Sequence, residues 1–449
     1  AVLGMGTVSC EDFLDRPTED NYNESNFYQN DEQCVQGVNY LYNSPWYDFQ
    51  RGFIKVGEIL SGNVYEGNSP YLNFTVNGTD ENLVNMSYSL WAVIGHANTV
   101  YTRLKTANAS EAVKNQCMGE CLAWKAMAYF YLVRSFGAVP IIHDNTAELN
   151  SGNYNSKFKV ETADVYEYII MTLEKAMELL PARGETGRID RYCAEGLLAK
   201  VYLTKSGLSG TRNADDLAKA AAKRLIDSRA FELYYDTESE PSDLSANYRN
   251  LFTYKGEQNK ERIFFTKDGA NDIWFRNMGT PLGGQGCAAP LKSLLDTYET
   301  IDGKTIQSLP ASERQQYEKN PLYKPRDPRL AATYILPGDN SSISNYTYTP
   351  FDPGSSDYVG KTGASRSGYM LKKFIDENDR STGYGSLDFP LYRYAEVLLD
   401  YVECLVETGD WQNPDVETYI NMIRHRAGLP AMDKSVYNTQ EKVLSLIHI

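Results

Sequence analysis

Aromatic residues that lie beside amides and a guanidinium distinguish two loop-like stretches of this sequence, residues 61–80 and 271–290. Both stretches are rich in turn-forming residues, and their rings have no apolar helical stripe to join. A pyranose presents apolar C–H faces that stack on flat rings, and its hydroxyls hydrogen-bond to amides, carboxylates and guanidinium groups. The pattern therefore predicts a sugar-binding surface, with packing in a loop as the alternative for each residue. The candidate ligand-binding residues are Tyr65, Tyr71, Asn73, Phe74, Trp274 and Arg276.

Catalytic, cofactor and metal motifs are not evident in the sequence. The four His form no HxH or HExxH pattern and the seven Cys form no CxxC pair, so we expect no metal site. The GGQG run at 283–286 lacks the Lys-Ser/Thr that completes a phosphate-binding loop. We therefore expect no cofactor and no catalytic residue. An all-helical glycoside hydrolase stays an alternative, because a catalytic carboxylate pair could be present among 59 acidic residues without a motif.

The charge balance argues against one class of partner. The formal net charge is −15 and the isoelectric point is about 4.9, with no basic run. Nucleic-acid affinity comes largely from Lys and Arg that neutralise phosphates, so we expect no nucleic acid as a partner. The sequence contains 34 Tyr, whose side chains combine an apolar ring with a polar hydroxyl. Such a number favours hydrated, adaptable recognition surfaces, and packing of Tyr at helix contacts is the alternative.

The first ten residues, AVLGMGTVSC, read as the end of a signal peptide that runs into a lipobox cysteine, Cys10. Lipidation of Cys10 would anchor the mature chain to a membrane without a spanning helix. No run of 18 apolar residues occurs in the chain. A chance apolar start is the alternative interpretation of residues 1–10.

Sequence with helical periodicity flanks the loop-like stretches, so we expect helices to position them. Apolar residues at helical spacing predict a core helix within Gly119–Pro140, and similar patterns recur at 162–180, 194–205 and 391–407. Helices joined by short links indicate a mostly α fold in which tetratricopeptide-like pairs form a scaffold.

The predicted scaffold comprises about residues 33–230 and 389–430. Between these parts, residues 231–388 form an irregular, loop-rich excursion. A long irregular stretch with many aromatic residues in a compact protein is usually functional. We therefore expect this subdomain to bind the ligand.

Seven stretches, taken in order along almost the whole chain, resemble the SusD/RagB family of nutrient-binding outer-membrane lipoproteins. They are SCEDFLDRPTE (9–19), LWAVIGHAN (90–98), GECLAWKAMAYFYLVRSFGAVPII (119–142), GRIDRYCAEGLLAKVYL (187–203), RDPRL (326–330), FPLYRYAEVLLDYVECLVETG (389–409) and NMIRHRAGLP (421–430). The resemblance implies one SusD-like domain over residues 11–449, with four tetratricopeptide-like helix pairs and an irregular subdomain.

The same resemblance implies a function. It implies a noncatalytic, lipid-anchored protein at the cell surface that binds an oligosaccharide or polysaccharide and delivers it to a TonB-dependent (SusC-like) outer-membrane transporter. Some members of the family take peptides instead, so a peptide ligand stays open. Binding residues in this family are not fixed by a motif, so none is carried over to this chain.

The end of the chain departs from the family pattern. After the RxRAGLP motif the family continues with a further helix and a closing segment, whereas this sequence stops at LSLIHI (444–449). We expect a truncated carboxy terminus with a nonnative tail.

Overall fold

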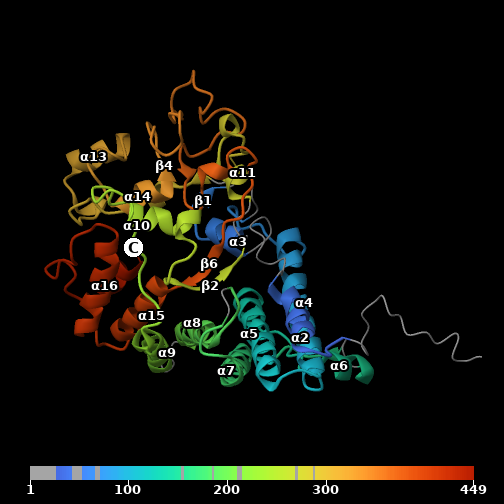
Figure 1. Ribbon diagram of the computed structural model, residues 1–449. Helices are drawn as coiled ribbons and strands as arrows, with labels where there is room; N and C mark the ends of the chain where they lie inside the picture. Colours follow the sequence, from blue (N-terminus) through green and yellow to red (C-terminus); the bar gives the residue numbers. More distant parts are fainter. Residues whose placement is uncertain are drawn as a thin grey trace, which may run out of the picture.

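A computed structural model describes residues 27–42, 53–65, 71–152, 156–184, 187–209, 215–267, 272–286 and 289–448. Stacked helices form one half of the molecule, and an irregular, loop-rich half lies above them in the view of Figure 1. The predicted mostly α fold is confirmed. Cys10 and the rest of residues 1–10 lie outside the described part of the chain.

The stacked helices come from both ends of the chain. The amino-terminal set is α2 (Asp31–Tyr42), α4 (Glu81–Leu104), α5 (Glu111–Phe136), α6 (Asn145–Ser151), α7 (Thr162–Leu179), α8 (Arg191–Ser209) and α9 (Asp215–Ser228). The carboxy-terminal set is α15 (Tyr394–Glu407), α16 (Pro414–Arg426) and α17 (Gln440–His448). Helix α15 packs against α9 and α8, which joins the two sets into one body.

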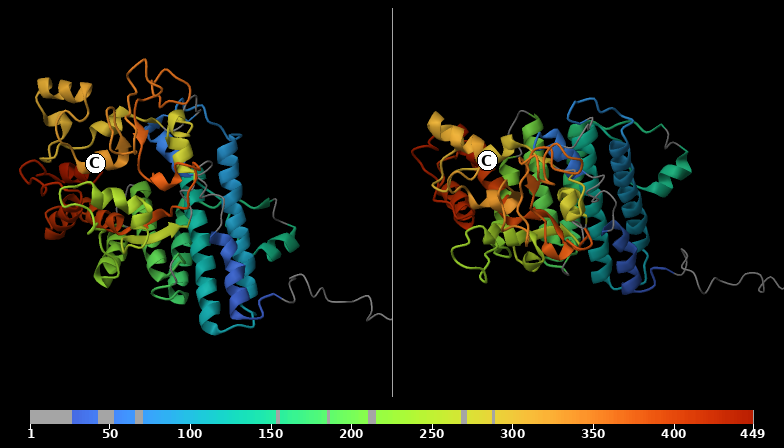
Figure 2. Two further views of the ribbon diagram at one scale, coloured as in Figure 1. Left: turned by 45° about the horizontal axis from the view of Figure 1, so that its top comes forward. Right: turned by 90° about the horizontal axis from the view of Figure 1, so that it is seen from above.

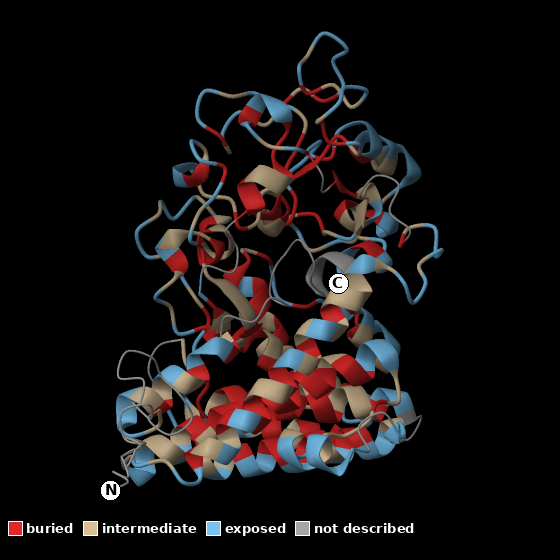
Figure 3. Ribbon diagram, turned by 90° about the vertical axis from the view of Figure 1, so that its right-hand side faces the viewer, coloured by how far each residue is buried: buried red, intermediate tan, exposed pale blue. Residues whose placement is uncertain are grey.

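Helix α5 is the centre of this body. It packs along α4 and α7, and Figure 2 shows α4 and α5 side by side in both views. Its buried positions include both faces of the helix, with Trp124 and Tyr129 among the largest fully buried side chains. The helix begins at the cap Ser110, whose side chain accepts a hydrogen bond from the Val113 amide, and ends at Gly137 with φ 71°. The prediction of a core helix here is confirmed, and Figure 3 shows many buried residues in the stacked helices.

The last described residues are folded. Helix α17 contacts α15, and its Val443 and Leu446 are buried in the main hydrophobic core. Residues 444–448, for which the sequence suggested a nonnative tail, therefore pack as part of the scaffold.

The irregular half contains only short elements. Its helices are α3 (Phe53–Leu60), α10 (Ala246–Arg249), α11 (Ile273–Asn277), α12 (Lys292–Asp296), α13 (Ala311–Lys319) and α14 (Pro328–Thr333), with 3-10 turns η4 (Asn250–Phe252), η5 (Tyr254–Gly256), η6 (Thr280–Leu282), η7 (Ile306–Ser308) and η8 (Glu377–Asp379). Its strands form antiparallel pairs: β1 (Val64–Tyr65) with β3 (Ala289–Pro290), β2 (Arg262–Thr266) with β6 (Phe389–Arg393), and β4 (Tyr334–Ile335) with β5 (Met370–Leu371).

Strand pairing joins segments that are far apart in the sequence. Because β1 pairs with β3, the stretch 61–65 belongs to the irregular half, although the predicted scaffold of about 33–230 included it. Within the part of the chain that the model describes, no helix combines the length and apolar character that crossing a bilayer requires.

Candidate ligand-binding site

One aromatic surface of the irregular half is a pair of stacked rings. The rings of Phe275 and Tyr384 lie with centroids 5.6 Å apart and planes 22° from parallel. Phe275 is partly exposed, and 51% of Tyr384 is accessible to solvent. We call this pair the aromatic shelf, because two nearly parallel rings beside solvent form a flat apolar face.

Helix α11 sets the direction of Phe275. The Phe275 amide donates to the Gly383 carbonyl at 3.1 Å, and its own carbonyl accepts from the Gln285 amide at 2.7 Å. The preceding residue points inward: Trp274 is 2% exposed, and its indole N–H donates to the Leu282 carbonyl at 2.9 Å. Burial of Trp274 and backbone bonds on both sides of Phe275 therefore hold the shelf ring at the surface.

A tight turn presents Tyr384. Gly383 has φ 74°, and a Cβ at this position would lie 3.5 Å from Cβ of Phe275. A glycine is therefore favoured where the turn lies against the shelf. The Gly383 amide donates to the Asp379 carbonyl at 2.8 Å, and the Tyr384 amide donates to the Thr382 hydroxyl at 3.2 Å.

Asp379 and Tyr254 support this turn from below. The Tyr254 hydroxyl donates to the Asp379 carboxylate at 2.8 Å and accepts from the Ser386 amide at 2.7 Å. Burial raises the pKa of Asp379 above its ordinary value. The carboxylate therefore acts as an internal hydrogen-bond acceptor of the turn.

Arg276 follows Phe275 on α11 and provides a polar group. It is partly buried, and its Nε donates to the Asp272 carboxylate at 2.6 Å in an i,i+4 ion pair. The pair balances the charge of Arg276 and fixes the orientation of its guanidinium group. Arg276 has further N–H groups with which it could donate to sugar hydroxyls.

Two of the predicted ligand-binding residues, Trp274 and Tyr71, are buried. Trp274 packs in a small core with Met278, Leu282 and Tyr348. Tyr71 is 3% exposed, packs against Ile59 and donates its hydroxyl to the Asp80 carboxylate. Both rings found apolar neighbours that lie outside their own loops, so neither offers a face to a ligand in this structure.

Three other predicted residues occupy different environments. Phe74 is 78% exposed and has φ 52°, while Asn73 beside it is also exposed. Tyr65 is partly buried in β1, where it pairs with Ala289. The structure therefore leaves Phe74 and Asn73 available at one loop tip, and places Arg276 directly after Phe275 on α11.

Two shelf residues were missed by the sequence reasoning as ligand candidates. Phe275 lies between the candidates Trp274 and Arg276 but was not itself among the predicted ligand-binding residues. Tyr384 lies in the run Thr-Gly-Tyr-Gly-Ser (382–386), and its flanking glycines are a turn signal that presents a ring. That signal was available in the sequence.

Comparisons with known proteins agree with this architecture. Two family models match: the SusD family over residues 231–448, and a family described as starch-binding, associating with the outer membrane, over residues 12–203. A SusD-like protein of Bacteroides ovatus is 29% identical over 440 residues, which cover 95% of this chain and 75% of the relative.

Solved structures show the same fold. A SusD-like carbohydrate-binding protein from Bacteroides fragilis superimposes with a TM-score of 0.78 at 23% identity, covering 94% of this chain and 83% of that chain. A structure described as containing a xylogluco-oligosaccharide gives a TM-score of 0.59 at 24% identity, covering 92% and 80%. Since the two family models together match both the stacked helices and the irregular half, the chain belongs to the SusD family.

Proposed function

We propose that this protein binds an oligosaccharide or polysaccharide at the cell surface without cleaving it and delivers it to a TonB-dependent outer-membrane transporter. In this proposal residues 11–449 act as one SusD-like domain, and Cys10 carries the lipid anchor in the outer membrane. The observation that carries the glycan proposal is the aromatic shelf of Phe275 and Tyr384, stacked at 5.6 Å and exposed beside Arg276.

The shelf suits the chemistry of a sugar ring. The apolar C–H face of a pyranose can lie flat on a ring pair that is only 22° from parallel, while equatorial hydroxyls reach the guanidinium of Arg276. Phe74 and Asn73 offer a second ring and amide on another loop. An oligosaccharide long enough to touch both loops would gain affinity from each contact.

The carboxylates that support the shelf favour binding over hydrolysis. Glycoside hydrolysis requires two carboxyl groups that flank the scissile bond, one as acid and one as base or nucleophile. Asp272 is ion-paired with Arg276 and only 3% exposed, and Asp379 is buried under Tyr254. Both carboxylates are thus engaged in holding the shelf.

Family and fold support the proposal from outside the site. One matching family is described as starch-binding and associated with the outer membrane, and the structure of one structural neighbour is described as being with a xylogluco-oligosaccharide. Delivery to a transporter and lipid anchoring rest on the family resemblance.

Calorimetric titration against a panel of plant, host and microbial polysaccharides tests the proposal. Each mixture is then assayed for new reducing ends. Binding without new reducing ends supports capture, and new reducing ends would overturn the noncatalytic proposal. Binding of peptides but of no glycan would favour a peptide-binding member of the family instead. Co-isolation with the transporter from outer membranes tests delivery. Its failure would overturn the proposed delivery to a transporter but not the proposed glycan binding.

A further inference from the structure

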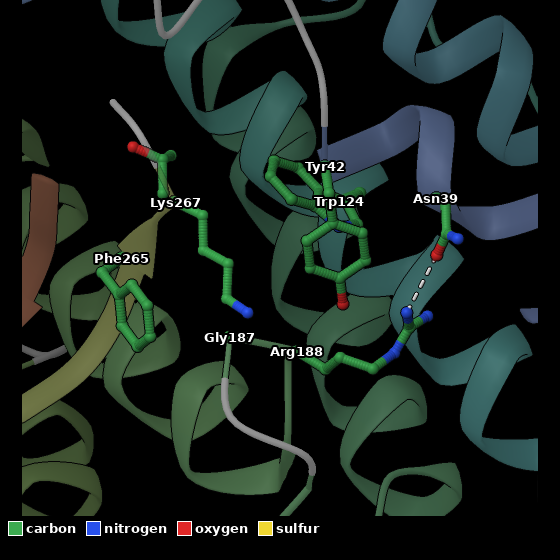
Figure 4. A pocket seen from close by; sticks show the side chains of 8 residues that line it. Asn39, Tyr42, Trp124, Gly187, Arg188, Phe265 and Lys267 are labelled. Carbon is green, nitrogen blue, oxygen red and sulfur yellow. Dashed lines mark hydrogen bonds between the residues drawn. The ribbon is translucent and has the colours of Figure 1, made fainter. Parts of the chain in front are cut away.

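A cavity of about 220 Å³ lies where α2, α5, β2 and the segment before α8 meet. Its lining includes Tyr42 from α2, Trp124 from α5, and Phe265, Thr266 and Lys267 at the end of the β2 segment. Figure 4 shows these side chains around one space, with Phe265 and Lys267 facing the rings of Tyr42 and Trp124. The shelf residues are not part of this lining.

Aromatic rings form much of the wall. Tyr42 and Trp124 pack edge to face, with centroids 5.2 Å apart and planes at 84°. Phe265 lies across the space from them in Figure 4. Such rings provide apolar contacts for the C–H groups of a small cyclic ligand.

Arg188 is held rigidly at the edge of the cavity. Its Nε and Nη2 both donate to Glu120, which is 0% exposed, and its Nη1 donates to the Asn39 amide oxygen at 2.9 Å. The Tyr42 hydroxyl also donates to Glu120 at 2.8 Å, and burial raises the pKa of Tyr42 well above its ordinary value. Glu120 therefore offsets the charge of Arg188 but leaves its remaining N–H groups available in the plane of the guanidinium.

Lys267 is positioned by a glycine. Gly187 has φ 88°, and a Cβ at this position would lie 2.9 Å from Cε of Lys267. The aliphatic part of Lys267 thus lies directly over the glycine, and its ammonium group points into the cavity in Figure 4. Among the residues that the model describes, Lys267 makes no ion pair.

The charge of the lining is the reverse of the charge of the protein. The chain has a formal net charge of −15, yet the lining residues that the structure describes include Arg188 and Lys267 and no Asp or Glu. Among these described residues Arg188 is balanced by Glu120, and Lys267 leaves about one positive charge without a described partner. Donor groups around a single positive charge select an acceptor-rich anionic group, and a carboxylate matches both the charge and the planar geometry of Arg.

We propose that this cavity binds one carboxylate-bearing sugar unit, a hexuronate, of a longer glycan. Lys267 pairs with the carboxylate, the free N–H groups of Arg188 hydrogen-bond to its oxygens or hydroxyls, and the aromatic walls contact the ring. The volume is below the roughly 300–1,000 Å³ of cavities that enclose drug-sized ligands, so it suits a single sugar ring. The proposal adds acidic glycans as a ligand class, whereas the aromatic shelf would bind neutral sugars.

A neighbouring cavity of about 200 Å³ shares Gly187, Arg188 and Phe265 with the first. Its described lining contains Arg183, Lys260 and Arg262 as well as Asp190 and Glu257, and Arg183 pairs with Asp190 at 3.4 Å. This mixed charge sets no preference for the sugar unit that follows the acidic one.

Lys260 provides a matched control. It also lines the neighbouring cavity, and it pairs with Glu232 at 3.2 Å on the surface, where its side chain is 69% exposed. Lys260→Met and Lys267→Met each remove one positive charge from the same β2 segment. Only the second removes the proposed carboxylate partner.

Calorimetric titration with trigalacturonate, neutral galactotriose and a sulfated galactotriose tests the proposal. We expect trigalacturonate to bind at least about tenfold more tightly than the neutral sugar, because a hydrogen bond to a charged group exceeds a neutral one. Lys267→Met should abolish this preference and Lys260→Met should keep it. Gly187→Ala should weaken uronate binding as well, since its Cβ displaces Lys267.

Further outcomes separate this proposal from the shelf. The double variant Phe275→Ala/Tyr384→Ala should retain the preference for the uronate even where neutral glycan binding is lost. Equal affinity for acidic and neutral sugars, no binding of trigalacturonate, or equal effects of the two Lys variants would overturn the proposal. Binding of the sulfated sugar as tight as that of the uronate would overturn the assignment to carboxylates.

Discussion

Arg426 and Glu261 form a buried ion pair, with Arg426 Nη1 2.7 Å from Glu261 Oε2 and with the two side chains 2% and 0% exposed. The residues are 165 positions apart, on α16 and just before β2. Arg393 donates to the other Glu261 oxygen, and the Tyr234 amide donates to Oε2 at 2.8 Å. A carboxylate with this many donors locks the carboxy-terminal helices to the irregular half.

Breaking this pair should be strongly destabilising. In Arg426→Met, Glu261 keeps Arg393 but loses a second buried cation, and we expect the free energy of unfolding to fall by about 3–5 kcal/mol. Chemical denaturation followed by circular dichroism measures the loss. Lys260→Met, which breaks an exposed pair with Glu232, should change stability by less than about 1 kcal/mol. If both variants lost a similar amount of unfolding free energy, burial of the Arg426–Glu261 pair would not explain the loss of stability.

Removal of either shelf ring should weaken glycan binding. We expect Phe275→Ala and Tyr384→Ala each to reduce the affinity for the bound polysaccharide about tenfold, which corresponds to about 1.4 kcal/mol of lost ring contact. Affinity electrophoresis or calorimetry with the glycan found in the panel measures the change. Phe351→Ala removes a ring that is 57% exposed on a different loop and should leave the affinity unchanged. Unchanged affinity in both shelf variants would show that the glycan binds elsewhere on the protein.

The helices of the scaffold were predictable because the signals that define a helix lie within a short stretch of sequence. The stripe in α5, its cap Ser110 and its terminating Gly137 all lie within one segment, and these local signals agree with the packing. The resemblance to a known family added the order of the elements. Neither source of information required knowledge of contacts between distant segments.

The candidate site was less predictable because distant contacts decide which rings are exposed. Trp274 is buried by Ile335, Tyr348 and Met370, which lie far along the chain. The composition of residues 271–290 indicated a loop, whereas the structure places Trp274 on the short helix α11. That composition carried no information about these distant neighbours. The partners of the RxRAGLP motif were hidden for the same reason, since Arg424 and Arg426 pair with Glu299 and Glu261 across the fold.

Phe74 should show opposite effects on stability and binding. Its φ of 52° is a left-handed conformation that costs a bulky residue about 1–2 kcal/mol, and 78% of the residue is exposed, so little packing repays that cost. Asn tolerates this conformation, and we expect Phe74→Asn to unfold at equal or higher temperature while glycan affinity falls. Phe74→Ala removes the ring but keeps the strain, so it should lose affinity without a gain in stability. Equal stability changes in the two variants would contradict a strained Phe74.

Asp400 should make stability depend on pH. It lies on α15 beside Glu396, and the Tyr392 hydroxyl donates to its carboxylate at 2.8 Å. Burial, with a further contribution from the charge of Glu396, raises the pKa of Asp400 from 3.8 to about 7, although Lys200 nearby partly opposes the shift. The folded state therefore binds the proton more tightly than the unfolded state. This contribution to stability is complete below about pH 4 and is lost as the pH rises to about 7.

Asp400→Asn tests this pH dependence directly. The neutral amide can still accept from Tyr392, so at pH 8 the variant should be more stable than the parent protein, by an amount on the order of 2 kcal/mol. At pH 4 the two proteins should differ little, because the parent carboxyl is then protonated. Denaturation midpoints measured from pH 4 to pH 8 give both values. Asp216→Asn, which removes an exposed carboxylate whose side chain is 75% accessible, serves as the control. A variant that is less stable than the parent at pH 8 would show that the charged form of Asp400 stabilises the fold through its neighbour Lys200.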